Sequence, residues 1–458
     1  MSGFLLTTAT SKPGGHAESA VRSTQLRNGW YEALSLHRLL FPGIVFAIHL
    51  VIIQIVASMA FRFGVESTLY PRERRQYGLL PIADGNWETI ITPLSRWNGL
   101  WYIWSSQRGF AFSNVNPIGR FAGADDVYWP LLPWIMGYGQ ALSRLPEAVV
   151  GYLFTNLCLV AALIVLYRLI EIDFGIAIAR RALWCIALFP TAFFLSAIST
   201  EAPFLFFAAS CLLAARYERW AIAGTAGLLA ALTNAHGVFL IFPMLVILLT
   251  QTRPTTLRWL PRIGLVLLPI LGPVIYGLRF HQSGYSSSTL LTLQQRQFAQ
   301  GKSPWAAVQC AMHGCSRDMT FASNIRVPGI TLEWARSLAE APSLELVTSA
   351  AWRQEVATSG AIGIVVTLGC LLLAGIGLFR LPFWMNAYVL PLLVSALIRL
   401  PGDGLFNAMP RFALLLFPVA IVLAILLDDP FTRIFMGTVS LTLLLFLTAQ
   451  YANWYWVA

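Results

Sequence analysis

Long apolar runs separated by short polar breaks make up most of the sequence from residue 40 onward. A helix needs about 20 mostly apolar residues to cross a bilayer, and LLFPGIVFAIHLVIIQIVASMAF at 39–61 is such a run. The pattern predicts an all-α protein, a polytopic bundle of about 11 transmembrane helices. The expected spans lie near 40–61, 148–168, 182–199, 203–216, 219–233, 237–251, 262–280, 360–379, 383–399, 410–427 and 433–451.

Two segments depart from this pattern. VYWPLLPWIMGYGQAL at 127–142 is apolar but contains two prolines and two glycines, so we expect a juxtamembrane or half-inserted helix over 128–143. Residues 1–39 are polar and lack the apolar core of a cleaved signal peptide. We therefore expect 1–39 to be a tail, 40–61 to be an uncleaved anchor, and 40–458 to form one membrane-embedded domain.

Basic residues in the short loops predict the orientation of the bundle, because such residues mark the cytoplasmic side of a membrane protein. The tail joins them on that side, and two long loops at about 62–147 and 281–359 then become extracytoplasmic. This alternation fails if 128–143 crosses the membrane. The residues that carry the prediction are Arg168, Arg180, Arg181, Arg216, Arg219, Arg253, Arg258, Arg262, Arg380 and Arg433.

Composition supports a membrane protein. Of 458 residues, 57% are apolar and 11% are charged, whereas soluble domains carry about 25% charged residues. The formal charge of +10 fits loop arginines that contact anionic lipid headgroups better than it fits nucleic-acid binding. We expect a multi-pass protein of a bacterial plasma membrane or an ER-type membrane.

The cysteines divide into two groups. One pair, Cys310 and Cys315, flanks His313 in the polar stretch QCAMHGCSRD. This set is weak evidence for a metal site, and a local disulfide or two free thiols are the open alternatives. The others lie in apolar runs and are expected in the core: Cys158, Cys185, Cys211 and Cys370.

The stretch LSRWNGLWYIWSSQRGF at 94–110 follows the first apolar run and is too polar to span. Its aromatic residues, among them Trp97, Trp101 and Tyr102, suit the membrane interface. The polar residue among them is Asn98, an amide that cannot act as a base.

Glu201 lies in SAISTEAP, where two apolar runs meet. An ionisable residue at the edge of a membrane bundle is a functional candidate. A glutamate there can also simply stabilise the N-terminus of the following helix. The sequence leaves both interpretations open.

Three other polar sets are weaker candidates. In TNAHG, Asn234 and His236 could bind a phosphate or move a proton, or merely form a loop between helices. Asp125 and Asp126 could provide acid–base chemistry, hold a metal, or cap a helix. Arg411, in MPRFALLLFPVAIVLA, could hold a phosphate or extend to headgroups. The absence of a Walker loop, dinucleotide fingerprint or zinc spacing argues against a cytoplasmic nucleotide-driven mechanism.

In order and spacing, several segments resemble the PIG-V-type mannosyltransferases, a branch of the membrane-embedded GT-C glycosyltransferases. They are RWNGLWYIWSSQRGF, VYWPLLPWI, FPTAFFLSAISTEAPFLFF, ERWAIAGTAGLLAALTNAHG, MPRFALLLFPVAIVLA and the closing NWYWVA. The resemblance implies a GT-C-like fold and transfer of a hexose, typically mannose, from a polyprenyl-phosphate donor to a hydroxyl of a glycan or glycolipid. It implies the extracytoplasmic side for this reaction and leaves room for a membrane-protein partner. It also gives Trp97, Trp101 and Tyr102 a use, because aromatic rings can stack on sugar faces. No cofactor and no metal ligands are expected from the residues, and whether the reaction requires a metal stays open.

At two positions the chain departs from the family pattern. The first-loop aspartate, which the resemblance assigns to the acceptor hydroxyl, is Asn98, and the arginine expected after Thr233 is Asn234. Another acid could serve as base, with Glu201 first and then Asp125 or Asp126. Alternatively the acceptor differs, or the chain is a non-catalytic subunit that binds lipid-linked saccharide. A transporter fits less well, because such proteins place acids within broken spans, and few are evident here.

Overall fold

The computed structural model describes residues 36–65, 87–108, 129–251, 260–282, 360–398, 409–455 and 457. Within these ranges every regular element is a helix, in agreement with the predicted all-α class. Asp125, Asp126, Cys310 and Cys315 lie outside the described residues, as do nearly all of the tail and of the loop at 281–359. The α-helices are α2 (Leu36–Phe63), α4 (Glu88–Ile91), α5 (Asn98–Arg108), α6 (Leu131–Ser143), α7 (Glu147–Ala187), α8 (Glu201–Arg216), α9 (Trp220–Thr233), α10 (Ile241–Gln251), α11 (Leu260–Val266), α12 (Leu271–Gln282), α18 (Gly360–Arg380), α19 (Phe383–Ile398), α20 (Met409–Phe412), α21 (Phe417–Leu426) and α22 (Pro430–Ala452). Short 3₁₀ turns are η3 (Thr92–Leu94), η5 (Ala192–Leu195), η6 (Ala235–Leu240), η8 (Leu268–Ile270) and η9 (Ala413–Leu415).

Four of the described helical stretches are long and apolar enough to cross a membrane: Arg38–Phe63, Glu147–Ala187, Leu260–Arg279 and Pro430–Ala452. A fifth is possible if the bent pair Met409–Leu415 and Phe417–Leu426, which turns by 84°, forms one span. These helices support a membrane protein. They do not confirm the expected count of about 11 spans.

Several expected spans are shorter than a bilayer requires. Helix α8 has 16 residues, which corresponds to a length of about 24 Å. Helix α9 has 14 residues and is about 21 Å long. The hydrocarbon core is about 30 Å thick, so neither helix crosses it alone. Helix α6 has 13 residues, and its length of about 20 Å agrees with a juxtamembrane element.

The expected span at 182–199 is wrong. Helix α7 breaks at Gly175, whose φ of 81° lies in the left-handed region, and ends at Ala187. Residues 188–200 that follow are irregular apart from η5. Pro190 supplies no backbone N–H in this stretch, and the length of the apolar run, on which the prediction depended, does not reveal such a break.

Neighbouring helices supply hydrogen bonds to this irregular backbone, as a low-dielectric surrounding requires. The ring of His49 on α2 donates through Nδ1 to the carbonyl of Ala187, at 2.7 Å. The hydroxyl of Ser440 on α22 donates to the carbonyl of Leu188, at 2.6 Å. These contacts explain how a non-helical segment is stable inside an apolar bundle.

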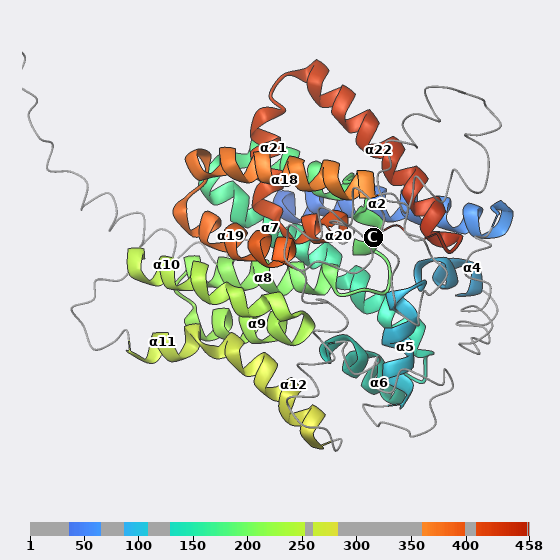
Figure 1. Ribbon diagram of the computed structural model, residues 1–458, viewed down its shortest axis with the longest axis horizontal. Coiled ribbons are helices and arrows are strands. Elements are labelled where there is room, and N and C mark those ends of the chain that lie inside the picture. Colours follow the sequence, from blue (N-terminus) through green and yellow to red (C-terminus); the bar gives the residue numbers. More distant parts are fainter. Residues whose placement is uncertain are drawn as a thin grey trace, which may run out of the picture.

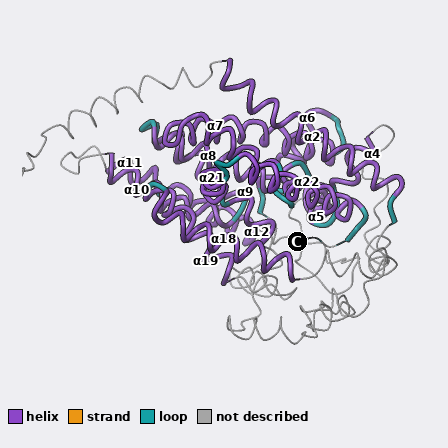
Figure 2. The backbone as a smooth tube through the Cα atoms, turned by 90° about the horizontal axis from the view of Figure 1, so that it is seen from above, coloured by secondary structure: helices purple, strands orange, loops and turns teal. Residues whose placement is uncertain are grey.

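Ion pairs gather at one end of the bundle. Glu171 on α7 pairs with Arg38 at 3.1 Å and with Arg168 at 2.7 Å. Asp173 pairs with Arg216 at the end of α8, at 2.6 Å. We call these residues the ion-pair layer. Helices α10 and α11 lie toward one end of the molecule in Figure 1, and α4, α5 and α6 lie toward the opposite end, as they also do in Figure 2.

The length of helix α7 gives the distance between the ion-pair layer and the end of the bundle near α5. At its start, Glu147 accepts a hydrogen bond from Gln107 of α5, at 3.5 Å. The 24 residues from there to Glu171 correspond to a rise of about 36 Å. Because this slightly exceeds the thickness of a bilayer core, the two polar ends can face opposite membrane surfaces.

Small residues permit close packing in the centre of the bundle. A Cβ at Gly224 of α9 would lie 2.5 Å from the carbonyl oxygen of Leu265, and one at Gly227 would lie 2.8 Å from Pro269. Glycines therefore let α9 approach α11 and η8 closely, as is common between membrane helices. Helix α8, which precedes α9, is buried along almost its whole length and is the central helix of the core.

Candidate functional site

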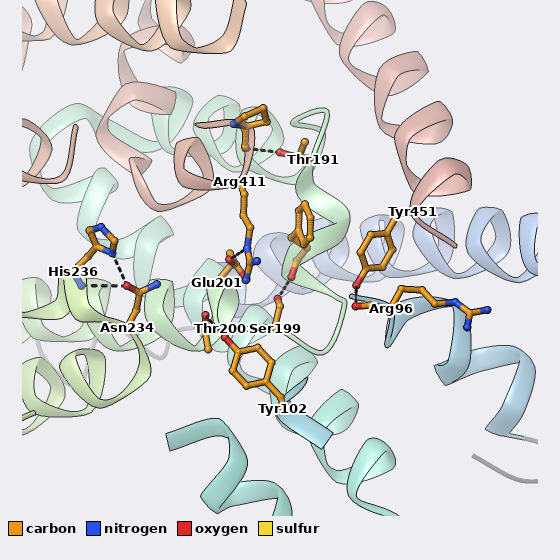
Figure 3. Close-up of polar contacts among 12 residues, drawn as sticks. Arg96, Tyr102, Thr191, Ser199, Thr200, Glu201, Asn234, His236, Arg411 and Tyr451 are labelled. Atoms are coloured by element: carbon orange, nitrogen blue, oxygen red, sulfur yellow. Dashed lines mark hydrogen bonds and ion pairs between the residues drawn. The ribbon is translucent and has the colours of Figure 1, made fainter. Parts of the chain in front are cut away.

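Glu201 and Arg411 form an ion pair, in which Arg411 donates through Nε to Oε1 of Glu201. Glu201 is the first residue of α8, directly after the irregular segment, and Arg411 lies in α20, at the start of the bent pair. Their side chains are 4% and 15% exposed. The structure thus brings together two candidates that the sequence places 210 residues apart, as Figure 3 shows.

Tyr102 of the first-loop helix α5 lies at the same site. Its hydroxyl is 3.4 Å from Oγ1 of Thr200. Burial raises the pKa of Tyr102 to about 12; Arg411 opposes this change and Glu201 adds to it. The phenol is therefore neutral at physiological pH and can donate a hydrogen bond.

Three contacts join the irregular segment at 188–200 to α20 and to the first loop. The hydroxyl of Thr191 donates to the carbonyl of Pro410 at 2.6 Å, which ties the irregular segment to α20. The backbone N–H of Ile198 donates to the carbonyl of Leu94 at 3.0 Å, which ties it to the first loop. The side chain of Arg411 packs on the ring of Phe194, with its guanidinium carbon 5.1 Å from the ring centroid. The ion pair is therefore built into the junction between two broken helical segments.

Asn234 and His236 lie in the turn between α9 and α10. The side chain of Asn234 accepts a hydrogen bond from the backbone N–H of His236 at 3.2 Å and also contacts the imidazole ring. The ring of His236 meets Phe412 edge-on, with centroids 4.7 Å apart. Because Phe412 follows Arg411, this contact places the predicted His236 next to the element that carries the arginine.

The first-loop aromatics are involved in packing within the protein. Trp97, whose φ is 53°, packs edge-on against Trp454, with centroids 5.7 Å apart. Trp101 packs against Trp104 at 5.6 Å. Asn98 begins α5 and is partly buried. These contacts link the first loop to the end of the chain and leave the expected sugar-binding role of Trp97 and Trp101 untested.

Arg96 was not identified from the sequence as a site residue. Its backbone carbonyl accepts from the hydroxyl of Tyr451 at 2.8 Å, and its guanidinium lies over the ring of Trp454, 4.6 Å from the centroid. Thr200 was also missed, although it directly precedes Glu201. The only sequence signal for Arg96 is its position near Asn98, and the only one for Thr200 is its position next to Glu201.

The site can perform acid–base chemistry on an anion-bearing substrate. It contains a buried carboxylate, a cation that prefers phosphate or carboxylate, and a neutral phenol. Within the described ranges, Oε2 of Glu201 has no hydrogen-bond partner, so this oxygen can accept a hydrogen bond from a substrate hydroxyl. In the same part of the chain, no group of three or more His, Cys, Asp and Glu side chains is arranged to hold a metal.

Comparisons with known proteins do not establish a family. No family model matches the chain, and no curated protein matches it. One solved structure, the apo form of the Archaeoglobus fulgidus oligosaccharyltransferase, aligns with 90% of this chain at 15% sequence identity and a TM-score of 0.38. The alignment covers 56% of that protein's chain. A likeness of this degree identifies neither a family nor an activity.

Proposed function

We propose that this chain is an integral membrane glycosyltransferase of the GT-C type, similar to the PIG-V-like mannosyltransferases. It transfers a hexose, with mannose the first choice, from a polyprenyl-phosphate donor to a hydroxyl acceptor on the extracytoplasmic side. The observation that carries the proposal is the buried pair of Glu201 and Arg411 at the junction of two broken helical segments. The pair combines the base and the phosphate-binding cation that this reaction needs.

In the proposed reaction, Glu201 takes the proton of the acceptor hydroxyl as the acceptor oxygen attacks C1 of the sugar. The bond between C1 and the phosphate oxygen breaks, and its electron pair leaves with the polyprenyl phosphate. The phosphate thus gains one negative charge while Glu201 loses one. Arg411 stabilises the developing charge on the phosphate, an effect that is large where water is excluded.

The test is transfer by the purified protein. It is incubated in lipid nanodiscs with radiolabelled polyprenyl-phosphate mannose and membrane extract, and products are separated by chromatography. A labelled product that requires Glu201 supports the proposal. Hydrolysis of the donor in water without an acceptor, or no product with any polyprenyl-phosphate hexose, counts against it.

A second candidate is a non-catalytic subunit that binds lipid-linked saccharide. Asn98 favours it, because an amide stands where the resembled family has its acid. The closed ion pair is also compatible with it, because a paired carboxylate need not act as a base. Saturable donor binding without transfer by wild-type protein, and equally without transfer by the Asn98→Asp variant, would support this candidate.

A further inference from the structure

The ion pair raises a problem for the proposed chemistry, because Arg411 cannot hold a donor phosphate fully while it holds Glu201. Both side chains are buried and in direct contact. Removing a buried charge from its partner is costly unless another opposite charge takes its place. Any anion that reaches Arg411 therefore competes with the carboxylate.

We infer that the phosphate of the lipid-linked donor displaces Glu201 from Arg411, so that donor binding itself frees the carboxylate that takes the acceptor proton. This inference rests on the proposed function and adds regulation to the same site. Before the donor binds, the positive charge of Arg411 compensates the negative charge of the Glu201 carboxylate. Afterwards the arginine faces the phosphate, and a carboxylate without its cation in a low-dielectric site is driven to accept a proton.

The geometry around Arg411 supports an exchange of partners. It lies in α20, a helix of four residues, within a pair of segments bent by 84°. Its planar guanidinium packs on the face of Phe194, and the edge of the fork, where an anion binds, holds the carboxylate of Glu201. Phosphate suits that fork as well as carboxylate does. The guanidinium can thus change its anionic partner and keep its aromatic support.

The charges balance through the whole cycle. The donor phosphodiester carries one negative charge and the released polyprenyl monophosphate carries up to two. Glu201 is negative before transfer and neutral after it. The negative charge near Arg411 therefore moves from carboxylate to phosphate as the sugar leaves. Glu201 then passes its proton to water, and the restored carboxylate competes with the product phosphate for Arg411 and promotes its release.

The experiment measures binding of farnesyl phosphate to protein in nanodiscs by microscale thermophoresis. Glu201→Gln removes the competing charge, so the Kd should fall by about tenfold or more, the lower range for close buried charges. Arg411→Gln should weaken binding, and adding Glu201→Gln to it should bring no gain. Glu171→Gln, which alters a buried acid of the ion-pair layer, should leave the Kd unchanged.

Two further measurements keep the inference falsifiable. Glu201→Asp retains the charge and shortens the side chain, so it should fold and give a smaller gain in affinity. Farnesol, which lacks the phosphate, should not distinguish wild type from Glu201→Gln. Equal or weaker farnesyl phosphate binding in both folded Glu201 variants overturns the inference, as does an equal gain for farnesol. Absence of transfer by wild-type protein instead contradicts the proposed function, so the two failures are distinguishable.

Discussion

Replacing Glu201 with glutamine should slow transfer by about 100- to 10,000-fold, the usual contribution of a positioned general base. Glutamine is nearly isosteric and its oxygen can still accept a hydrogen bond from Arg411, but it cannot take the acceptor proton. The rate loss corresponds to about 2.7–5.5 kcal/mol of activation free energy. If the inference above is right, the Kd for the donor falls while the rate constant for transfer also falls.

The substitution also affects stability, and the assay must separate the two effects. Losing one partner of a buried ion pair costs about 3–5 kcal/mol. The hydrogen bond retained by glutamine should keep the loss toward the lower value. Transfer is therefore measured as a single-turnover rate at saturating donor, normalised to protein that elutes as a folded species.

Glu171→Gln is the matched control. Glu171 is 9% exposed and pairs with Arg38 and Arg168, so its replacement breaks ion pairs of the same kind at the other end of the bundle. We expect a similar loss in melting temperature and an unchanged single-turnover rate. A wild-type rate in folded Glu201→Gln, or an equal rate loss in both variants, would refute the assignment of Glu201 as the base.

Three other outcomes are expected. Asn98→Asp should raise or create transfer activity in the same assay if the pocket is otherwise intact, and no change indicates that the pocket has diverged from the resembled family. Gly237→Ala should lower the melting temperature, by an overpacking cost of about 1–3 kcal/mol, because a Cβ there would meet the backbone of α9, whereas Gly264→Ala, at a position with open space, should not. In a background without the six native cysteines, a cysteine at Gly301 should react with an impermeant reagent from outside intact cells, and one at Thr255 only after permeabilisation. The reverse labelling would contradict the orientation of the bundle.

Apolar runs were sufficient to locate the long helices. Helix α2 and helix α22 follow runs at 40–61 and 433–451 whose length alone predicts a membrane helix. The segment at 188–200 could not be predicted in this way. It is as apolar as a helix, and some of its backbone carbonyls accept hydrogen bonds from residues far away in the sequence, Leu188 from Ser440 and Ser196 from Asn156.

The site was predictable one residue at a time. Glu201 and Arg411 each stood out as a charged group beside an apolar run, and Tyr102 as an aromatic residue of the first loop. A single sequence does not indicate which of them meet. Their meeting depends on the bend between Leu415 and Phe417 and on the irregular segment at 188–200, and apolar run lengths predict neither feature. Asp125 and Asp126 lie outside the described residues, so their expected role as alternative bases stays a prediction.

The short helices determine how deep the site lies. From Arg216 in the ion-pair layer to Glu201, helix α8 rises about 22 Å. If the ion-pair layer marks one boundary of a hydrocarbon core about 30 Å thick, Glu201 lies about 8 Å below the opposite boundary. Under the proposed function, a donor phosphate leaves the headgroup region to reach Arg411, and the cation compensates for the lost hydration. Before donor binding, the carboxylate of Glu201 gives the guanidinium the opposite charge that a buried cation at this depth requires.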